Sequence, residues 1–189
     1  MKLRSAAFVL LFCSSLLTGC LTAEFKDIRL KLNADGKSGT GVMLFTGISS
    51  SPGDTLDVSA DDFRSLIDEY YLGKKIESEN KGMKNVKKRL FMKDGALCGE
   101  VTFEFDNVTD LGIYQHNGVG PYMYYTVADG FFTSGQYETS NGTYAGEKMP
   151  LVFWEPSTRD FHIKMALSTP QEIRKPLASL FEDWQQRKK

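Results

Sequence analysis

The sequence predicts an α+β domain: a mainly antiparallel sheet or open barrel built from β-hairpins, with one internal helix and one C-terminal helix packed on it. Three observations support this prediction. Apolar and polar residues alternate with a period of two in several segments. Asp-Gly pairs, which favour tight hairpins because glycine adopts positive φ, separate three pairs of such segments. Two other segments repeat apolar residues at helical spacing.

Four hairpins are expected. In the first strand Ile28, Leu30 and Leu32 alternate with charged residues, as in a strand with one buried face. Asp-Gly pairs form the first three turns, residues 155–159 form the fourth, and Asn141-Gly142 marks a further turn. The paired strands are expected at residues 25–32 and 40–48 (around Asp35-Gly36), 86–92 and 100–106 (Asp94-Gly95), 121–127 and 136–140 (Asp129-Gly130), and 149–155 and 160–167.

Two helices are expected among these strands. The internal one covers residues 59–73, with Ser59 as N-cap and Gly73 as the stop. Its apolar face comprises Phe63, Leu66, Ile67, Tyr70 and Tyr71. The second lies within residues 168–189, where Pro176 is expected to begin a fresh helix or bend a longer one. Its apolar stripe comprises Ile173, Leu177, Leu180, Phe181 and Trp184.

The start of the chain has the pattern of an export signal. Lys2 and Arg4 precede an uncharged run over residues 5–22, which matches the charged and apolar regions of a secretory signal peptide. The tetrapeptide Leu17-Thr18-Gly19-Cys20 resembles the lipobox of bacterial lipoproteins. That resemblance implies cleavage before Cys20, a diacylglycerol on its thiol and usually a further acyl chain, such as palmitate, on the new amino group. The alternative is an ordinary secretory signal cut nearby, for example after Ala23.

The lipobox resemblance also implies the domain organisation and the location. Residues 1–19 would be the signal peptide, residues 20–24 an acylated N-terminus with a short tether, and residues 25–189 a single domain at the membrane. The residue after Cys20 is Leu21 rather than Asp, which favours the outer membrane if the source is Gram-negative. Removal of Lys2 and Arg4 changes the formal net charge from −1 to −3, so no nucleic-acid partner is expected.

The order of elements over roughly residues 25–105 resembles that of LppM-type lipoproteins. Those proteins also have a lipobox, an early hairpin, a helix and then a hairpin, which here runs through Asp94-Gly95 to Gly99. The resemblance implies a domain that binds a lipid or glycolipid.

The sequence favours a domain without enzymatic activity, metal or cofactor. His116 and His162 are far apart in sequence and lie in no metal-binding or nucleophile motif. The stretch DGKSGTG lacks the first glycine of a P-loop, so a hairpin turn is the better interpretation. Cys98 is expected to be a small buried residue rather than a reactive thiol.

Two groups of residues are candidate ligand contacts. Tyrosines gather beside the glycine-rich loop at 117–120, where aromatic rings can form a ligand mouth. The segment 74–93 is rich in lysine, as in a patch for lipid head groups. The candidates are Tyr114, Tyr122, Tyr124, Lys87 and Arg89. The alternatives are tyrosines packed in the core and lysines that protect a strand edge.

The preferred function is therefore binding: the domain holds an amphiphile between sheet and helix, or docks to another envelope protein. One alternative is an envelope-acting hydrolase assembled from scattered residues such as Asp110, His116 and Glu138. The other is a structural accessory subunit. An amphiphile binder predicts a continuous apolar cavity larger than about 300 Å³. A docking module predicts an exposed apolar patch, and a hydrolase predicts convergent titratable groups.

Overall fold

The computed structural model describes residues 20–51, 57–126, 135–167 and 174–188. Within these ranges the chain forms mostly strands, with a few short helices, and every strand pairing is antiparallel. The predicted α+β class is confirmed. The expected signal peptide, residues 1–19, lies outside the described residues.

The main sheet has six strands in the order β5-β6-β3-β2-β12-β9. They are β2 (Phe25–Leu32), β3 (Gly39–Thr46), β5 (Lys84–Lys93), β6 (Ala96–Phe105), β9 (Gln136–Ser140) and β12 (Asp160–Ala166). The hairpins β2–β3 and β5–β6 form at the predicted Asp-Gly turns. Asp94 and Gly95 both have positive φ, 52° and 77°, as a two-residue hairpin turn requires.

A smaller sheet in the order β10-β11-β8-β7 packs on the inner face of the main sheet. Its strands are β7 (Ile113–Gln115), β8 (Tyr122–Tyr125), β10 (Thr143–Tyr144) and β11 (Leu151–Trp154). The ring of Phe161 in β12 meets Tyr122 and Trp154 edge-on, with ring centroids 5.1 and 5.2 Å apart. These aromatic contacts hold the two sheets face to face.

Two of the expected hairpins are wrong. β8 belongs to the small sheet and β9 to the main sheet, and β11 and β12 are divided in the same way. The positions of these four strands were expected correctly. The connections from β8 to β9 and from β11 to β12 cross between the two sheets, because the apolar faces of β8 and β11 are buried against the main sheet. The expected turn at Asp129-Gly130 lies outside the described residues.

A third sheet forms at one end of the molecule, in the order β1-β4-β13. It comprises β1 (Cys20–Thr22), β4 (Ser49–Ser51) and β13 (Lys175–Pro176). Residues 20–24 were expected to form a tether, and this expectation is wrong, since Cys20 lies opposite Ser51 in the ladder. The physical reason is burial: Ala23 and the partly buried Leu21 pack into an apolar cluster and hold the N-terminal segment on the domain.

The helices are α1 (Ser59–Ser65), which continues as the π-helix η1 (Leu66–Tyr71), α2 (Lys75–Glu79), α3 (Ala178–Gln186) and the short 3₁₀ helices η2 (Val108–Leu111) and η3 (His116–Gly118). The expected N-cap at Ser59 is wrong, because Val58 holds that position and the Asp57 carboxylate accepts the Ser59 N–H at 3.1 Å. Pro176 lies in β13 and neither starts nor bends a helix. Helices α2, η2 and η3 were not expected.

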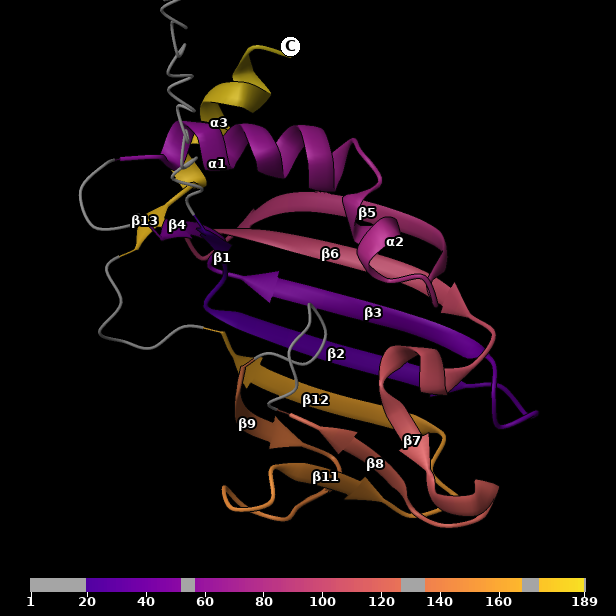
Figure 1. Ribbon diagram of the computed structural model, residues 1–189. Coiled ribbons are helices and arrows are strands. Elements are labelled where there is room, and N and C mark those ends of the chain that lie inside the picture. Colours follow the sequence, from indigo (N-terminus) through magenta and orange to yellow (C-terminus); the bar gives the residue numbers. More distant parts are fainter. Residues whose placement is uncertain (1–19, 52–56, 127–134, 168–173, 189) are drawn as a thin grey trace, which may run out of the picture.

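The inner face of the main sheet is covered by two unlike units. Helices α1 and α3 lie across its β5 side, and the small sheet lies at its β12 side (Figure 1). The cluster under the helices comprises Ala23, Ile48, Leu66, Leu97, Leu177 and Phe181. The cluster between the sheets includes Ile28, Met43, Val101, Phe103, Tyr124, Val152, Trp154 and Phe161. The apolar core is therefore divided into two parts along one sheet.

Asn141 joins the two sheets where the chain leaves β9 for β10. Its side-chain oxygen accepts hydrogen bonds from the Trp154 indole N–H at 2.7 Å and the His162 backbone N–H at 2.9 Å. Its amide nitrogen donates to the Asp160 carbonyl at 2.9 Å. Gly142 follows because a Cβ there would lie 2.7 Å from the Trp154 indole nitrogen. One amide side chain therefore connects β11 of the small sheet to β12 of the main sheet.

Replacing Asn141 by Ala should lower the free energy of unfolding by about 2–3 kcal/mol, since three hydrogen bonds are lost at about 1 kcal/mol each. Urea denaturation measures the change. Asn141→Asp is the matched control, because it keeps the accepting oxygen and should cost about 1 kcal/mol. Equal stability of the wild type and Asn141→Ala would contradict this role.

Lys26 lies on the inner face of β2 and is fully buried. Its neighbours across the ladder are Phe45 on β3 and Met165 on β12. Burial lowers the pKa of Lys26 from 10.5 to about 7, because removal of water disfavours the charged ammonium. The folded state therefore holds fewer protons than the unfolded state between about pH 7 and 10.5.

The free energy of unfolding should consequently fall as the pH is lowered from about 10.5 to about 7. At 1.36 kcal/mol per pKa unit, the decrease should be roughly 3–5 kcal/mol. Below about pH 7 Lys26 should cause no further decrease. Lys26→Met removes the titrating group. Its stability advantage over the wild type should shrink between pH 6.5 and pH 10 in urea denaturation. Parallel pH profiles for the two proteins would contradict the assignment.

Candidate functional site

A cavity of about 280 Å³, slightly smaller than the roughly 300 Å³ expected of an amphiphile binder, lies between η1 and the inner face of the main sheet. Its walls are mainly apolar and include Leu21, Ala23, Ile48, Leu66, Leu90 and Val101. Phe45 and Tyr70, which also line it, pack against both apolar clusters. The cavity therefore occupies the seam where the helix-covered part of the core meets the sheet-covered part.

Gly99 leaves space at this seam. On the inner row of β6 it lies between Leu97 of the helix cluster and Val101 of the sheet cluster. A Cβ at this position would lie 3.2 Å from the Ile48 side chain and 3.4 Å from that of Leu90. A larger side chain here would therefore project among the residues that line the cavity.

The π-helix η1 forms the roof. The Leu72 N–H donates to the Ile67 carbonyl at 2.8 Å, an i→i+5 bond that widens the helical turn. The widened turn allows Leu66, Tyr70 and Tyr71 to line the cavity together. Gly73 follows the roof because a Cβ there would lie 2.5 Å from the carbonyl oxygens of the preceding turn. Glycine is therefore required where the chain leaves the roof.

The charged groups that line the cavity are paired. The Lys88 ammonium, only 12% exposed, donates to the Glu77 carboxylate at 2.9 Å and to the Gly73 carbonyl at 2.6 Å. These bonds tie α2 and the end of the roof to β5. Arg89 and Glu100 also border the cavity, but their side chains point to the outer face of the sheet, where they form an ion pair at 3.1 Å across β5 and β6. Burial raises the pKa of the Tyr70 phenol, which keeps it neutral.

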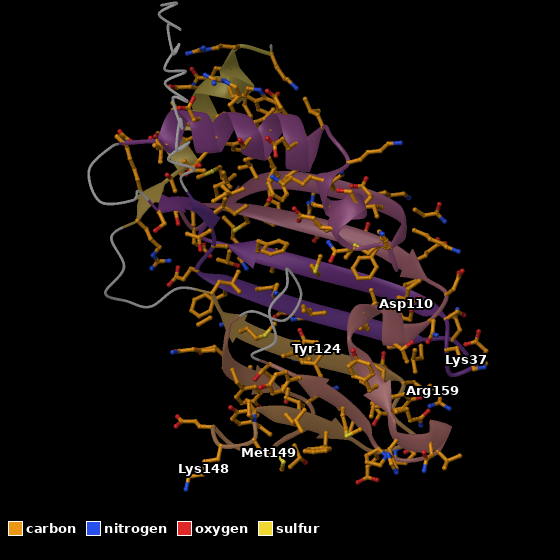
Figure 2. The ribbon with its side chains drawn as sticks, viewed as in Figure 1. Lys37, Asp110, Tyr124, Lys148, Met149 and Arg159 are labelled. Carbon is orange, nitrogen blue, oxygen red and sulfur yellow. The ribbon has the colours of Figure 1, made fainter. Side chains whose placement is uncertain are left out.

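The structure does not bring the expected ligand contacts together. In β8, Tyr122 and Tyr124 face the core and are 3% and 2% exposed, so the core alternative describes both. Tyr114, 58% exposed, lies opposite Met123 on the other face. Figure 2 shows Tyr124 inside the molecule, away from Lys148 and Met149 at its lower edge. Burial raises the pKa of Tyr124 well above its usual value.

Of the two basic candidates, only one lies at the cavity. Arg89 borders it, although its side chain points to the outer face of the sheet. Lys87 is exposed on the outer face of the sheet, opposite Thr102. The helical residues Leu66, Tyr70 and Tyr71 were expected on the apolar face of the internal helix, but Ile48, Ala23 and Gly99 were missed as cavity residues. Only one feature of the sequence pointed to Gly99: a glycine inside a strand often marks a place where a ligand or another backbone approaches closely.

The residues of the hydrolase alternative lie on separate elements. Asp110 is in η2, His116 in η3 and Glu138 on β9. Among the described residues, no group of three or more His, Cys, Asp or Glu side chains is arranged to hold a metal ion. His162 lies 3.1 Å from the Asp27 carboxylate. Cys98 is a buried free thiol.

The chain matches no protein-family model, and we find no curated protein and no solved structure that is significantly similar to it. In the part of the chain that the structure describes, no helix is long and apolar enough to cross a membrane.

Replacing Glu77 by Gln should lower the free energy of unfolding by about 1–2 kcal/mol, because the partly buried Lys88 ammonium loses its carboxylate partner. Urea denaturation provides the measurement. Glu79→Gln on the same helix is the matched control, since Glu79 is exposed. The role of the ion pair would be contradicted if the control cost as much as the test variant.

Proposed function

We propose that this protein is a lipid-anchored lipoprotein of the bacterial cell envelope whose domain binds one alkyl chain of an amphiphile in the cavity beneath η1. The cavity carries the proposal: it is mainly apolar, measures about 280 Å³ and lies between helix and sheet. Because its charged groups are paired, the site offers hydrocarbon contact rather than acid–base or metal chemistry.

The volume of the cavity sets the size of its ligand. Benzene, with six carbon atoms, fits an apolar cavity of about 150 Å³. In proportion, about 280 Å³ accommodates roughly ten or eleven carbon atoms of one chain. At about 0.8 kcal/mol for each buried methylene, the gain approaches 8 kcal/mol, which corresponds at best to a micromolar dissociation constant.

The lipobox pattern at Leu17-Thr18-Gly19-Cys20 supports the anchor. Two or more acyl chains hold a protein stably on a membrane, so the partner of the N-terminus is the bilayer itself. In a Gram-negative cell, Leu21 after the modified cysteine favours the outer membrane, with the domain facing the periplasm or the cell surface. The near-neutral formal charge of the chain gives no support to a nucleic-acid partner.

A second candidate function is docking to another envelope protein, as a binding module or a structural accessory subunit. The outer face of the small sheet favours it, since Tyr114, Met123 and Phe153 lie opposite one another there. Tyr114, Tyr125 and Met149 are 58%, 43% and 50% exposed. Exposed apolar patches of this kind are typical of protein contacts.

The test of the alkyl site uses the mature chain with Cys20→Ala, exported behind an ordinary secretory signal, and decanoate as the probe. Calorimetry should give a dissociation constant of about 1–100 μM. Gly99→Val should weaken binding at least tenfold, because its methyl groups project among the lining residues. Thr102→Val, on the outer face of the same strand, should leave binding unchanged.

Thermal unfolding of both variants verifies that they fold. A folded Gly99→Val variant that binds decanoate as tightly as the parent would contradict the site, and so would the absence of binding by the parent.

The anchor is tested separately in the native host. Cys20→Ala should abolish incorporation of labelled palmitate and retention in the membrane fraction, because no other residue supplies the thioether. Cys98→Ala is the control and should retain both, since the Cys98 thiol is buried. A Cys20→Ala protein that still incorporates palmitate would show that the lipobox interpretation is wrong.

A further inference from the structure

The residue proposed to carry the lipid lies directly beside the cavity. Cys20 begins β1 and pairs with Ser51. The next three residues, Leu21, Thr22 and Ala23, all line the cavity. The domain therefore has no spacer between the proposed acylation site and the apolar space beneath η1.

The distances are compatible with an intramolecular occupant. Three strand residues span about 10 Å. An acyl chain that fills one leaflet is about 15 Å long, half the hydrocarbon thickness of a bilayer. A chain attached at Cys20 is therefore long enough to enter between η1 and the sheet.

The polar groups of the cavity also favour a chain whose head group stays outside. Lys88 is occupied by Glu77 and the Gly73 carbonyl. Arg89 and Glu100 pair with each other on the outer face of the sheet, away from the apolar space. A free charged amphiphile would have to compete with these partners for its head group, whereas a chain that is linked covalently outside the cavity requires only hydrocarbon contact.

We propose that the cavity holds one alkyl chain of the protein's own anchor on Cys20, an inference that rests on the proposed acylation and alkyl site. A tethered chain has a millimolar effective concentration, so it outcompetes free single-chain amphiphiles present at lower concentrations. The remaining chains keep the protein on the bilayer. The end of the domain at β1 then lies against the membrane surface.

The test labels the anchor in living cells with a palmitic acid analogue that carries a diazirine near its chain end. Irradiation and peptide mass spectrometry should give an intrachain cross-link between the Cys20 peptide and a peptide that contains Leu66–Tyr71 or Lys88–Leu90. Gly99→Val should reduce the yield of this cross-link at least tenfold. Thr102→Val should leave it unchanged.

The mass of the adduct distinguishes the two sources of an alkyl chain. A cavity peptide joined to a phospholipid would show that a membrane lipid is the occupant, and would overturn the proposal. The proposal would also be overturned if the acyl chain on Cys20 were cross-linked only to lipids. In either case decanoate binding by the Cys20→Ala chain still decides the proposed function independently.

Discussion

The six-stranded sheet has one mainly apolar face, interrupted by Lys26 and Lys88, and the rest of the structure depends on covering it. Strand alternation places Met43, Val101 and Ile163 on this face, where all three are buried. The small sheet covers one part and the helices cover the other. Because a helix and a sheet present surfaces of different shape, the two coverings do not close completely where they meet. The seam at Gly99 is the result.

The same seam connects several local features of the chain with the proposed function. The π-turn in η1, the ion pair between Lys88 and Glu77 and the missing side chain at Gly99 all shape one apolar space. β1 brings the start of the described chain to its edge. The proposed amphiphile site and its nearness to the proposed lipid anchor therefore rest on how the sheet is covered, rather than on a catalytic or charged motif.

The sequence predicted nearly every long strand, because alternation such as Ile28, Leu30 and Leu32 reports a buried face directly. It did not predict which layer a strand joins: β8 and β9 both alternate, but their partners depend on contacts distant in the chain. Tyr114 and Tyr124 look alike in sequence, and only the register separates an exposed ring from a buried one. The cavity lies where the helices and the small sheet meet over the main sheet, and this contact is not visible in the sequence. Only the glycine at position 99 indicated a special site there.

The most direct measurement is the affinity of the unacylated chain for unbranched carboxylates of six to sixteen carbons, by calorimetry. Each added methylene should tighten binding about fourfold, from 0.8 kcal/mol per methylene, up to about ten or eleven carbons. Beyond that length the affinity should level off, because further carbons project into water. An affinity that is independent of chain length, or that rises steadily to sixteen carbons, would contradict a cavity of this size as the binding site.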